Sequence, residues 1–322
     1  MKQDEIPIFF TVDERYAPYL DCAIRSMMKN ASKSHTYQII VLHEDLTGES
    51  QEKLSANVKP PFQIRFLPMK DKLAGITDRA ENRLRCDYFT LTIYFRLFIA
   101  DLFPEYDKGI YLDSDIVVPG DISQLYRTEL GDNIIAACTD RSIAPVPELV
   151  HYTQDAVGIP IDRYINSGVL VMNLKKMREV GFSGHFLRLL NTYHFDCIAP
   201  DQDYFNAMCS GKIVYLDESW DAMPPEGGGT GATLEHPSLI HYNLFQKPWC
   251  YDNIPYEDYF WGYAKGSSFY EDIVRYKETY SEEQKRSDRA SLNRLIHKGL
   301  TAGDMPVTFR KMGEKGEKIR VC

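Results

Sequence analysis

Short apolar runs alternate with helix-like stretches along the first half of the chain. Residues 6–12 (IPIFFTV) and 37–42 (YQIIVL) are compact apolar runs of strand length, and residues 16–29 between them place apolar side chains at helical spacing. This alternation is typical of an α/β fold with a largely parallel sheet and helices on both faces. Further strand-like runs lie at residues 62–67, 108–112, 134–138 and 168–174, and further helix-like stretches at 48–58 and 92–102.

The pattern is not interrupted sharply at any point before residue 280, and the chain contains no internal repeat. We expect one domain over residues 1–280 and a basic C-terminal extension over residues 281–322. The charge distinguishes the extension, because residues 285–322 carry a formal charge of +6 whereas the rest of the chain carries −15.

Residues 291–300 of the extension place Leu292, Leu295, Ile296 and Leu300 at helical spacing among basic residues. This pattern predicts a short basic amphipathic helix. Two interpretations stay open. The helix docks on the main domain, or it is a peripheral anchor that binds the inner face of an anionic membrane.

The overall charge and the cysteines narrow the class of protein. A formal net charge of −9 argues against general nucleic-acid binding. The seven cysteines are scattered without a Cys-x-x-Cys pair, and no segment has the length of a membrane span or the pattern of a signal peptide. We therefore expect a cytoplasmic protein with reduced thiols.

Two aspartates stand one residue apart directly after the predicted strand 108–112. The carboxylates of Asp113 and Asp115 could converge on one divalent cation, because such ions prefer oxygen ligands. Ligands bind at the carboxyl ends of strands in open α/β sheets, so the position suits a functional site. An ordinary Asp-rich turn would look the same. The sequence DSDIV also fits the opening of haloacid-dehalogenase-like phosphatases, in which the first Asp is a nucleophile.

Several other polar residues could have either a structural or a functional role. Arg96 lies in an apolar helical stretch, where its charge needs a partner or a cleft, and His241 ends an apolar run. Lys247 belongs to a Lys-Pro-Trp segment and could reach a phosphate. Asp13 and Asp140 follow predicted strands, and Asn166 precedes one. Asp201 and Gln202 lie at the start of a predicted helix. Residues 226–231 (EGGGTG) form a predicted surface loop or lid.

Taken in order, five segments resemble family 8 of the retaining glycosyltransferases, which contains glycogenin, bacterial lipopolysaccharide glucosyl- and galactosyltransferases and plant galactinol synthases. The resemblance runs over residues 8–249 and is far more specific than an Asp-x-Asp pair alone. It implies a GT-A fold, a Rossmann-like α/β domain that binds a UDP-sugar with Mn²⁺. The segments are FFTVDERYAPYL, IYFRLFIADLFPEYDKGIYLDSDIVV, INSGVLVMNLKKM, PDQDYFN and IHYNLFQKPW.

The resemblance also implies roles for individual residues. Asp113, Asp115 and His241 would bind the metal, and imidazole among the ligands favours Mn²⁺ over the alternative Mg²⁺. Nucleotide-sugar binding is implied for nine residues: Thr11, Val12, Asp13 and Tyr16 at the uracil and ribose, and also Arg96, Asp113, Ser114, Asn166 and Lys247. Catalytic roles are implied for Asp140, which would face the acceptor, and for Asp201 and Gln202, which would line the sugar site together with Asn166.

The sequence departs from the pattern of the family in two places. Residue 15 is Arg where Asn is frequent, beside the implied ribose site. Residues 242–246 hold no Gly, although a Gly there often lets the backbone approach phosphate.

The implied activity is retaining transfer of glucose or galactose from a UDP-sugar to a glycan, a lipid-linked or another hydroxyl acceptor. The metal and Lys247 would neutralise charge on the departing UDP. We expect front-face attack, in which Gln202 stabilises positive charge on the sugar and the departing phosphate acts as base. Double displacement through Asp201 or Gln202 is the other route. The alternative functions are a phosphohydrolase and a non-catalytic nucleotide-sugar-binding protein.

Overall fold

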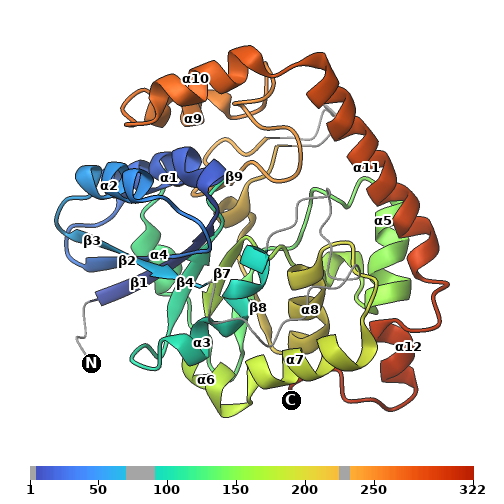
Figure 1. Cartoon of the computed structure of the whole chain (residues 1–322). Helices are drawn as coiled ribbons and strands as arrows, with labels where there is room; N and C mark the ends of the chain where they lie inside the picture. The colour runs from blue at the N-terminus through green and yellow to red at the C-terminus, as the bar shows by residue number, and fades with distance from the viewer. Residues whose placement is uncertain (1–4, 70–90, 225–232) are drawn as a thin grey trace.

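The computed structural model describes residues 5–69, 91–224 and 233–322. Within these residues, the centre is a seven-stranded sheet in the order β3-β2-β1-β4-β7-β6-β8 (Figure 1). Strand β7 is antiparallel to both of its neighbours and the other neighbouring strands are parallel, which confirms the expected mostly parallel mixed sheet. The strands are β1 (Glu5–Val12), β2 (Thr36–His43), β3 (Phe62–Pro68), β4 (Gly109–Leu112), β6 (Ile135–Ala137), β7 (Val169–Met172) and β8 (Ile213–Tyr215), and a separate pair is formed by β5 (Ile116–Val117) and β9 (Ile240–His241).

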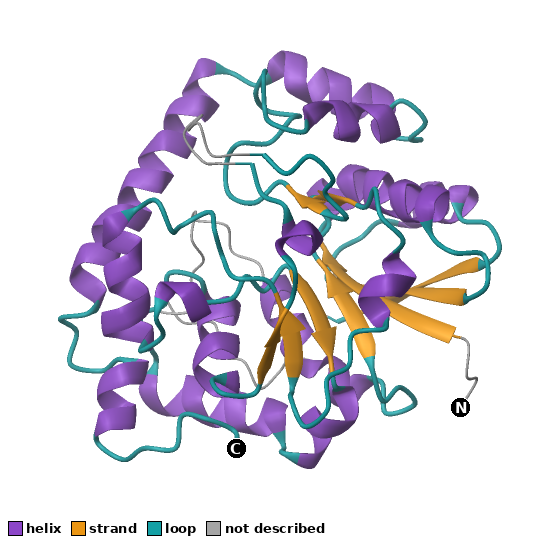
Figure 2. Ribbon diagram, turned by 180° about the vertical axis from the view of Figure 1, so that it is seen from behind, coloured by secondary structure: helices purple, strands orange, loops and turns teal. Residues whose placement is uncertain are grey.

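Alternating side chains of strand β1 build a core on each face of the sheet. Phe9 belongs to one apolar cluster and Ile8 and Phe10 belong to the other. Helices α1, α2, α4, α9 and α10 contribute to the Ile8 cluster, and the remaining α-helices to the Phe9 cluster, so helices cover both faces (Figure 2). The helices are α1 (Ala17–Asn30), α2 (Gly48–Asn57), α3 (Ile99–Leu102), α4 (Ile122–Tyr126), α5 (Pro147–Tyr152), α6 (Leu174–Glu179), α7 (Phe182–Tyr193), α8 (Pro200–Cys209), α9 (Glu257–Ala264), α10 (Tyr270–Thr279), α11 (Glu282–Ala302) and α12 (Phe309–Glu314).

Two predicted elements differ in detail from the structure. The helix expected over residues 92–102 is a 3₁₀ helix, Leu91–Phe98, followed by the single turn of α3. The strand expected over residues 168–174 is shorter at its C-terminal end, because the side chain of Asn173 accepts a hydrogen bond from the N–H of Lys176 and so caps the start of α6.

The C-terminal extension packs against the Phe9 cluster. Helix α11 begins with a capping box at Ser281 and runs along α5, where Leu295 is buried (Figure 1). The ring of Phe309 in α12 lies 3.9 Å from the ring of Phe195 and 5.0 Å from that of Tyr204. These contacts agree with the interpretation in which the extension docks on the main domain. Contact of the extension with a membrane stays a prediction.

Six of the seven cysteines lie in the described part of the chain. The cysteines there are free, and all except Cys322 are buried. No helix in these residues combines the length and the apolar character needed to cross a bilayer.

Candidate active site

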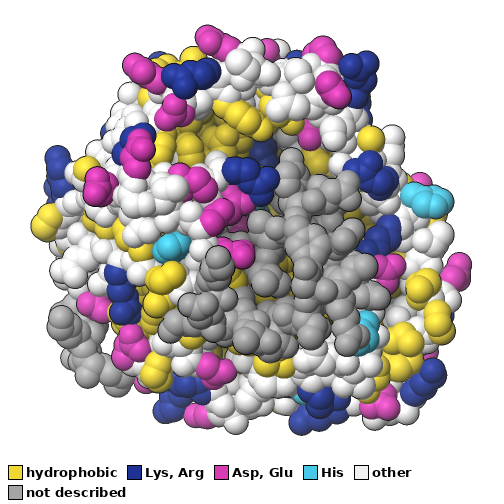
Figure 3. Space-filling view, in the orientation of Figure 1, with side chains coloured by type: hydrophobic (Ala, Val, Ile, Leu, Met, Phe, Trp, Pro, Cys, Tyr) yellow, Lys and Arg dark blue, Asp and Glu magenta, His cyan; other side chains and the backbone are white. Residues whose placement is uncertain are grey.

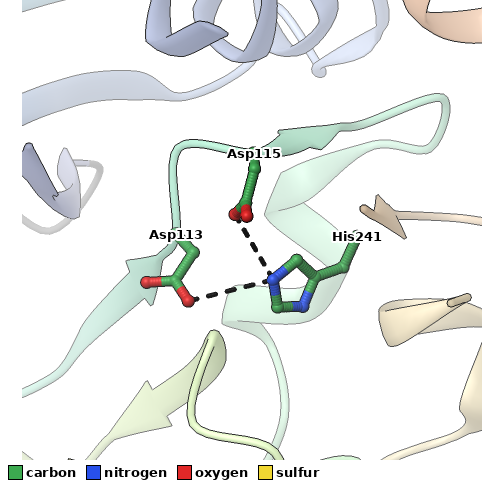
Figure 4. Close-up of side chains that lie close together, drawn as sticks. All are labelled: Asp113, Asp115 and His241. Atoms are coloured by element: carbon green, nitrogen blue, oxygen red, sulfur yellow. Dashed lines mark ion pairs between the residues drawn. The ribbon is translucent and has the colours of Figure 1, made fainter. Parts of the chain in front are cut away.

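Three side chains that could ligate a metal meet where β4 ends (Figure 4). Asp113 and Asp115 lie in the turn between β4 and β5, and β5 pairs antiparallel with β9 so that Ile116 stands opposite His241. This pairing brings Nε2 of His241 to 3.4 Å from Oδ1 of Asp115 and 3.8 Å from Oδ2 of Asp113. Ligand atoms of the three residues all lie within 4.8 Å of one another, as binding of a single ion requires.

Asp221 contacts the ring of His241 on the side opposite the two aspartates. Its Oδ1 lies 3.1 Å from Nδ1 of His241, and both side chains are buried. A proton on Nδ1 leaves the lone pair of Nε2 directed at Asp113 and Asp115. Burial would lower the pKa of His241, but the carboxylates of Asp221 and Asp115 raise it above its ordinary value. The carboxylates thus give the site a negative potential, which a divalent cation at Nε2 would balance in place of a proton. Two carboxylates and an imidazole fit a divalent ion such as Mn²⁺.

The backbone at Gly168 leaves room for this arrangement. A Cβ atom at this position would clash with Cε1 of His241 and with Oδ2 of Asp113. The Gly of the Asn-Ser-Gly segment is therefore required by the close approach of His241 and Asp113.

Asp113 is held by side chains from other elements. The hydroxyl of Tyr111 donates to Oδ1 of Asp113 at 2.7 Å and lies 2.7 Å from the hydroxyl of Thr11. Nη2 of Arg96 lies 2.9 Å from Oδ1 of Asp113, and its guanidinium lies 4.3 Å from the ring centroid of Tyr111. Nη1 of Arg96 pairs with Asp201 at 3.1 Å, and Arg96 is only 4% exposed. Arg96 thus has two carboxylate partners. It links residues 113–115, which we call the metal-ligand turn because they carry two of the three candidate ligands, to α8.

A cavity of about 550 Å³ opens beside the metal-ligand turn. Its lining includes all four residues implied for the nucleoside, Thr11, Val12, Asp13 and Tyr16. Asp13 accepts a hydrogen bond from the N–H of Tyr16 at 3.2 Å and pairs with Arg15 at 2.6 Å. The Arg that departs from the family pattern therefore holds the carboxylate of Asp13.

Lys247 connects the cavity to the metal-ligand turn. Its Nζ lies 2.6 Å from Oδ2 of Asp115 and donates to the carbonyl oxygen of Tyr242 at 2.6 Å. Burial would raise the pKa of Asp115, but Lys247 and His241 lower it, so the carboxylate of Asp115 is ionised. Ser114, between the two aspartates, lines the same cavity.

The loop before Lys247 adopts a left-handed turn without a Gly. Leu244 has a φ of +59°, a region that costs an ordinary L-residue about 1–2 kcal/mol. Oδ1 of Asn243 accepts a hydrogen bond from the N–H of Leu244 at 2.8 Å, which supports the turn locally. Leu244 and Phe245 both line the larger cavity. The sharp turn therefore forms without a Gly, and Leu244 adopts the strained left-handed conformation.

A smaller pocket of about 150 Å³ adjoins the larger cavity and shares Arg96 and Asp113 with it. Asn166, Asp201 and Gln202, the residues implied for the sugar site, line this smaller pocket. The two cavities therefore adjoin each other at Arg96 and Asp113.

Asp201 and Gln202 are held differently in the smaller pocket. Oδ2 of Asp201 accepts from the hydroxyl of Ser167 at 2.9 Å and belongs to the ion pair with Arg96. Oε1 of Gln202 accepts from the N–H of Ser167 at 3.0 Å, and its Nε2 donates to Oδ2 of Asp140 at 2.8 Å. The charge of Asp201 is therefore compensated by Arg96, whereas Gln202 presents a neutral amide to the pocket.

Asp140 lies behind the pocket rather than in its wall. It is 1% exposed and accepts hydrogen bonds from the hydroxyl of Ser142 at 2.5 Å, Nδ2 of Asn166 at 3.2 Å and Nε2 of Gln202. In this position Asp140 orients two side chains of the smaller pocket. Its implied role toward the acceptor stays a prediction.

The structure adds residues that the sequence reasoning missed. Tyr111 stands two residues before Asp113 in an extended segment, so strand alternation puts both on one face, and this signal was available. Asp221 carries no such signal, because it reaches His241 only through the tertiary fold. The predicted loop or lid at residues 226–231 lies outside the described residues.

A Rossmann-like mixed sheet with an Asp-x-Asp turn at the carboxyl end of a central strand, and with His241 of β9 beside that turn, defines the protein as a GT-A glycosyltransferase in architecture. The chain belongs to Glycosyl transferase family 8, which it matches over residues 7–253. The resemblance of the five segments is thereby confirmed.

Individual proteins support the same assignment. A Haemophilus influenzae protein is 26% identical over 221 residues, which cover 68% of this chain and 64% of the relative's length. The lipopolysaccharide 1,2-glucosyltransferase of Escherichia coli K12 is 27% identical over 256 residues, covering 75% of this chain and 72% of the enzyme. The structure of the galactosyltransferase LgtC, in complex with donor and acceptor sugar analogues, superposes with a TM-score of 0.63 at 24% identity, covering 88% of this chain and 100% of LgtC. The phosphohydrolase alternative finds no support among them.

Proposed function

We propose that the chain is a retaining glycosyltransferase that moves glucose or galactose from a UDP-sugar to a hydroxyl of a glycan or lipid-linked acceptor. The observation that carries the proposal is the grouping of Asp113, Asp115 and His241 at the junction of two cavities of different size. The larger cavity suits a nucleoside diphosphate and the smaller one a sugar. The names of the Escherichia coli glucosyltransferase and of LgtC support a hexose donor and a sugar acceptor.

Asp113, Asp115 and His241 would hold Mn²⁺, with Mg²⁺ as the alternative. A divalent ion bound there supplies charge neutralisation for a departing diphosphate. Lys247 adds a positive group in the same cavity, and Arg96 holds Asp113 in place. The backbone turn at Leu244 shapes the wall beside these charges.

We propose front-face transfer within the smaller pocket. The bond from the anomeric carbon to the diphosphate oxygen breaks, the acceptor oxygen bonds to the same face of that carbon, and the hydroxyl proton passes to the departing phosphate. Double displacement would need a free nucleophile, but Asp201 is engaged with Arg96 and Ser167, and an amide is a weak nucleophile. Gln202 is therefore assigned the stabilisation of positive charge on the sugar.

The test is release of UDP from a panel of UDP-sugars in the presence of Mn²⁺. We expect hydrolysis or transfer with UDP-glucose or UDP-galactose, and loss of both on addition of EDTA. Phosphate release from sugar phosphates without a nucleotide would support the phosphohydrolase alternative instead. Tight binding of UDP-sugar with no turnover under any metal would support a non-catalytic binding protein.

We further propose that residues 1–280 form the catalytic domain and that the basic extension, residues 281–322, contacts the inner face of an anionic membrane. Support comes from the charge of +6 over residues 285–322 and from Leu300, which is 55% exposed beside basic residues such as Arg310 and Lys311. A peripheral position of this kind would bring a cytoplasmic enzyme to a lipid-linked acceptor.

A further inference from the structure

The outer wall of the larger cavity comes from a part of the chain beyond the family match. The match ends at residue 253, whereas Asp272, Ile273 and Tyr276 of α10, Tyr280 and Asp288 line the same cavity as Thr11 and Tyr16. Figure 1 shows α10 above α1, and Figure 3 shows hydrophobic side chains gathered in a hollow beneath it. This wall therefore lies outside the residues that the family match covers.

Hydrogen bonds fix the wall to the segment that carries Lys247. Nζ of Lys277 in α10 donates to the carbonyl oxygens of Pro248 at 2.8 Å and Tyr251 at 2.9 Å. The hydroxyls of Tyr251 and Tyr280 both donate to Oδ2 of Asp288 at 2.6 Å. Helix α10 is thus fixed relative to the loop of the binding site before any ligand enters.

The two cavities define which part of a donor would meet this wall. Arg96 and Asp113 line both the larger cavity and the smaller sugar pocket, so they mark the junction of the two. Tyr276 and Tyr280 line only the larger cavity, and so they lie away from the sugar pocket. In an extended nucleotide-sugar, the group farthest from the sugar is the nucleoside.

The chemistry of the wall favours a nucleoside over a phosphate. Asp272 and Asp288 contribute carboxylates, which repel phosphate oxygens and can accept hydrogen bonds from ribose hydroxyls. Aromatic rings line the cavity, and Tyr19 stacks on Trp249 with ring centroids 3.9 Å apart. A planar base packs well on such rings.

We propose that Tyr276 forms the outer side of a nucleoside subsite and packs its ring on the nucleoside of the donor. The inference rests on the proposed function of the same cavity. Tyr276 is 42% exposed, and its ring lies 5.6 Å from that of Tyr280, centroid to centroid. The side chain is therefore supported from within the wall and still has surface available for a ligand. Burial of that surface against a base or ribose would strengthen binding of the nucleoside part alone.

The experiment compares Tyr276→Ala, Tyr276→Phe and the control Tyr259→Ala by isothermal titration calorimetry with Mn²⁺ present. Tyr259 is similarly exposed, at 38%, but lies on α9 and does not line the cavity. The probes are UDP and inorganic pyrophosphate, which shares the diphosphate but lacks the nucleoside. Melting temperatures check that each variant is folded.

We expect Tyr276→Ala to weaken UDP binding by about tenfold, in the range found for loss of an aromatic stacking partner, with unchanged pyrophosphate binding. Tyr276→Phe should retain most of the UDP affinity, and Tyr259→Ala should match the unmodified protein. Equal UDP affinity in Tyr276→Ala, an equal loss for pyrophosphate, or an equal loss in Tyr276→Phe would each overturn the role of the ring. Failure of the unmodified protein to bind UDP would instead overturn the proposed function, and the subsite with it.

Discussion

Oδ1 of Asp221 lies 3.1 Å from Nδ1 of His241, on the side of the imidazole opposite Asp113 and Asp115. Asp221 is fully buried, and its second oxygen has no hydrogen-bond partner within the described residues. Burying a carboxylate with one oxygen unpaired is costly, so the placement of Asp221 is best explained by its effect on the ring. It orients His241 and directs Nε2 toward the two aspartates.

We expect Asp221→Asn to weaken Mn²⁺ binding by about 10- to 100-fold, as changes to a residue supporting a metal ligand do. The loss should be visible in titrations of Mn²⁺ followed by electron paramagnetic resonance. Asp221 ends a short 3₁₀ helix, Glu218–Asp221, and Asp217→Asn is the control because Asp217 caps the start of that helix from an exposed position. Unchanged Mn²⁺ affinity in Asp221→Asn would contradict the positioning role.

Asp113→Asn and Asp115→Asn should each reduce transfer to below about a hundredth of the original rate, because charge stabilisation of the leaving group is lost. UDP binding should no longer depend on Mn²⁺ in either variant. Circular dichroism should show an intact fold, since both residues lie in a turn. Full activity of either variant, or of the unmodified protein in EDTA, would refute the metal site.

Gln202→Ala should lower turnover by about 10²-fold with little change in UDP affinity, as loss of a contact made in the transition state does. The structure supports this separation because Gln202 lines only the smaller pocket. Product configuration determined by NMR should be retained. Near-normal turnover, or an inverted product, would argue against the proposed mechanism.

Substitutions at Leu244 test the strained turn. Leu244→Gly should be neutral or stabilising by up to about 1 kcal/mol, because relief of the left-handed strain exceeds the entropy cost of Gly. Leu244→Val should be less stable than Leu244→Gly by about 2 kcal/mol, because a β-branched residue is poorly suited to positive φ. Urea unfolding measures both. Since both variants remove the Leu side chain, equal stabilities would mean that position 244 is unstrained.

Membrane contact is tested by charge reversal rather than by truncation, because removal of the extension would expose the apolar surface beneath Leu295 and Phe309. Reversal of Lys315, Lys318 and Arg320 to Glu should weaken binding to anionic liposomes by more than about tenfold, at about 1 kcal/mol for each basic residue near the surface. Added salt should weaken binding of the unmodified protein. Matched reversals at exposed positions outside the extension serve as controls, at Lys33, Lys59 and Lys265. Equal and negligible binding to anionic and neutral liposomes at low salt would leave the extension a purely structural element.

Local patterns predicted much of this protein. The apolar runs at residues 6–12 and 37–42 were correctly placed as strands, since a buried parallel strand needs a continuous apolar segment. The Asp-x-Asp turn was found because ligand sites follow strand ends. His241 was identified through the Lys-Pro-Trp segment that follows it, by resemblance to a family rather than by its own surroundings.

Tertiary structure alone decided how these pieces act together. The pairing of β5 with β9 brings His241 to Asp115 across 126 positions of the chain, and the same long-range packing puts Asp221 behind His241 and α10 over the cavity. Burial of Asp140 and the positive φ of Leu244 also depend on surrounding contacts. Periodicity reports the neighbours of a residue along one helix or strand, whereas contacts between distant segments depend on how complete elements pack, and no local spacing encodes that packing.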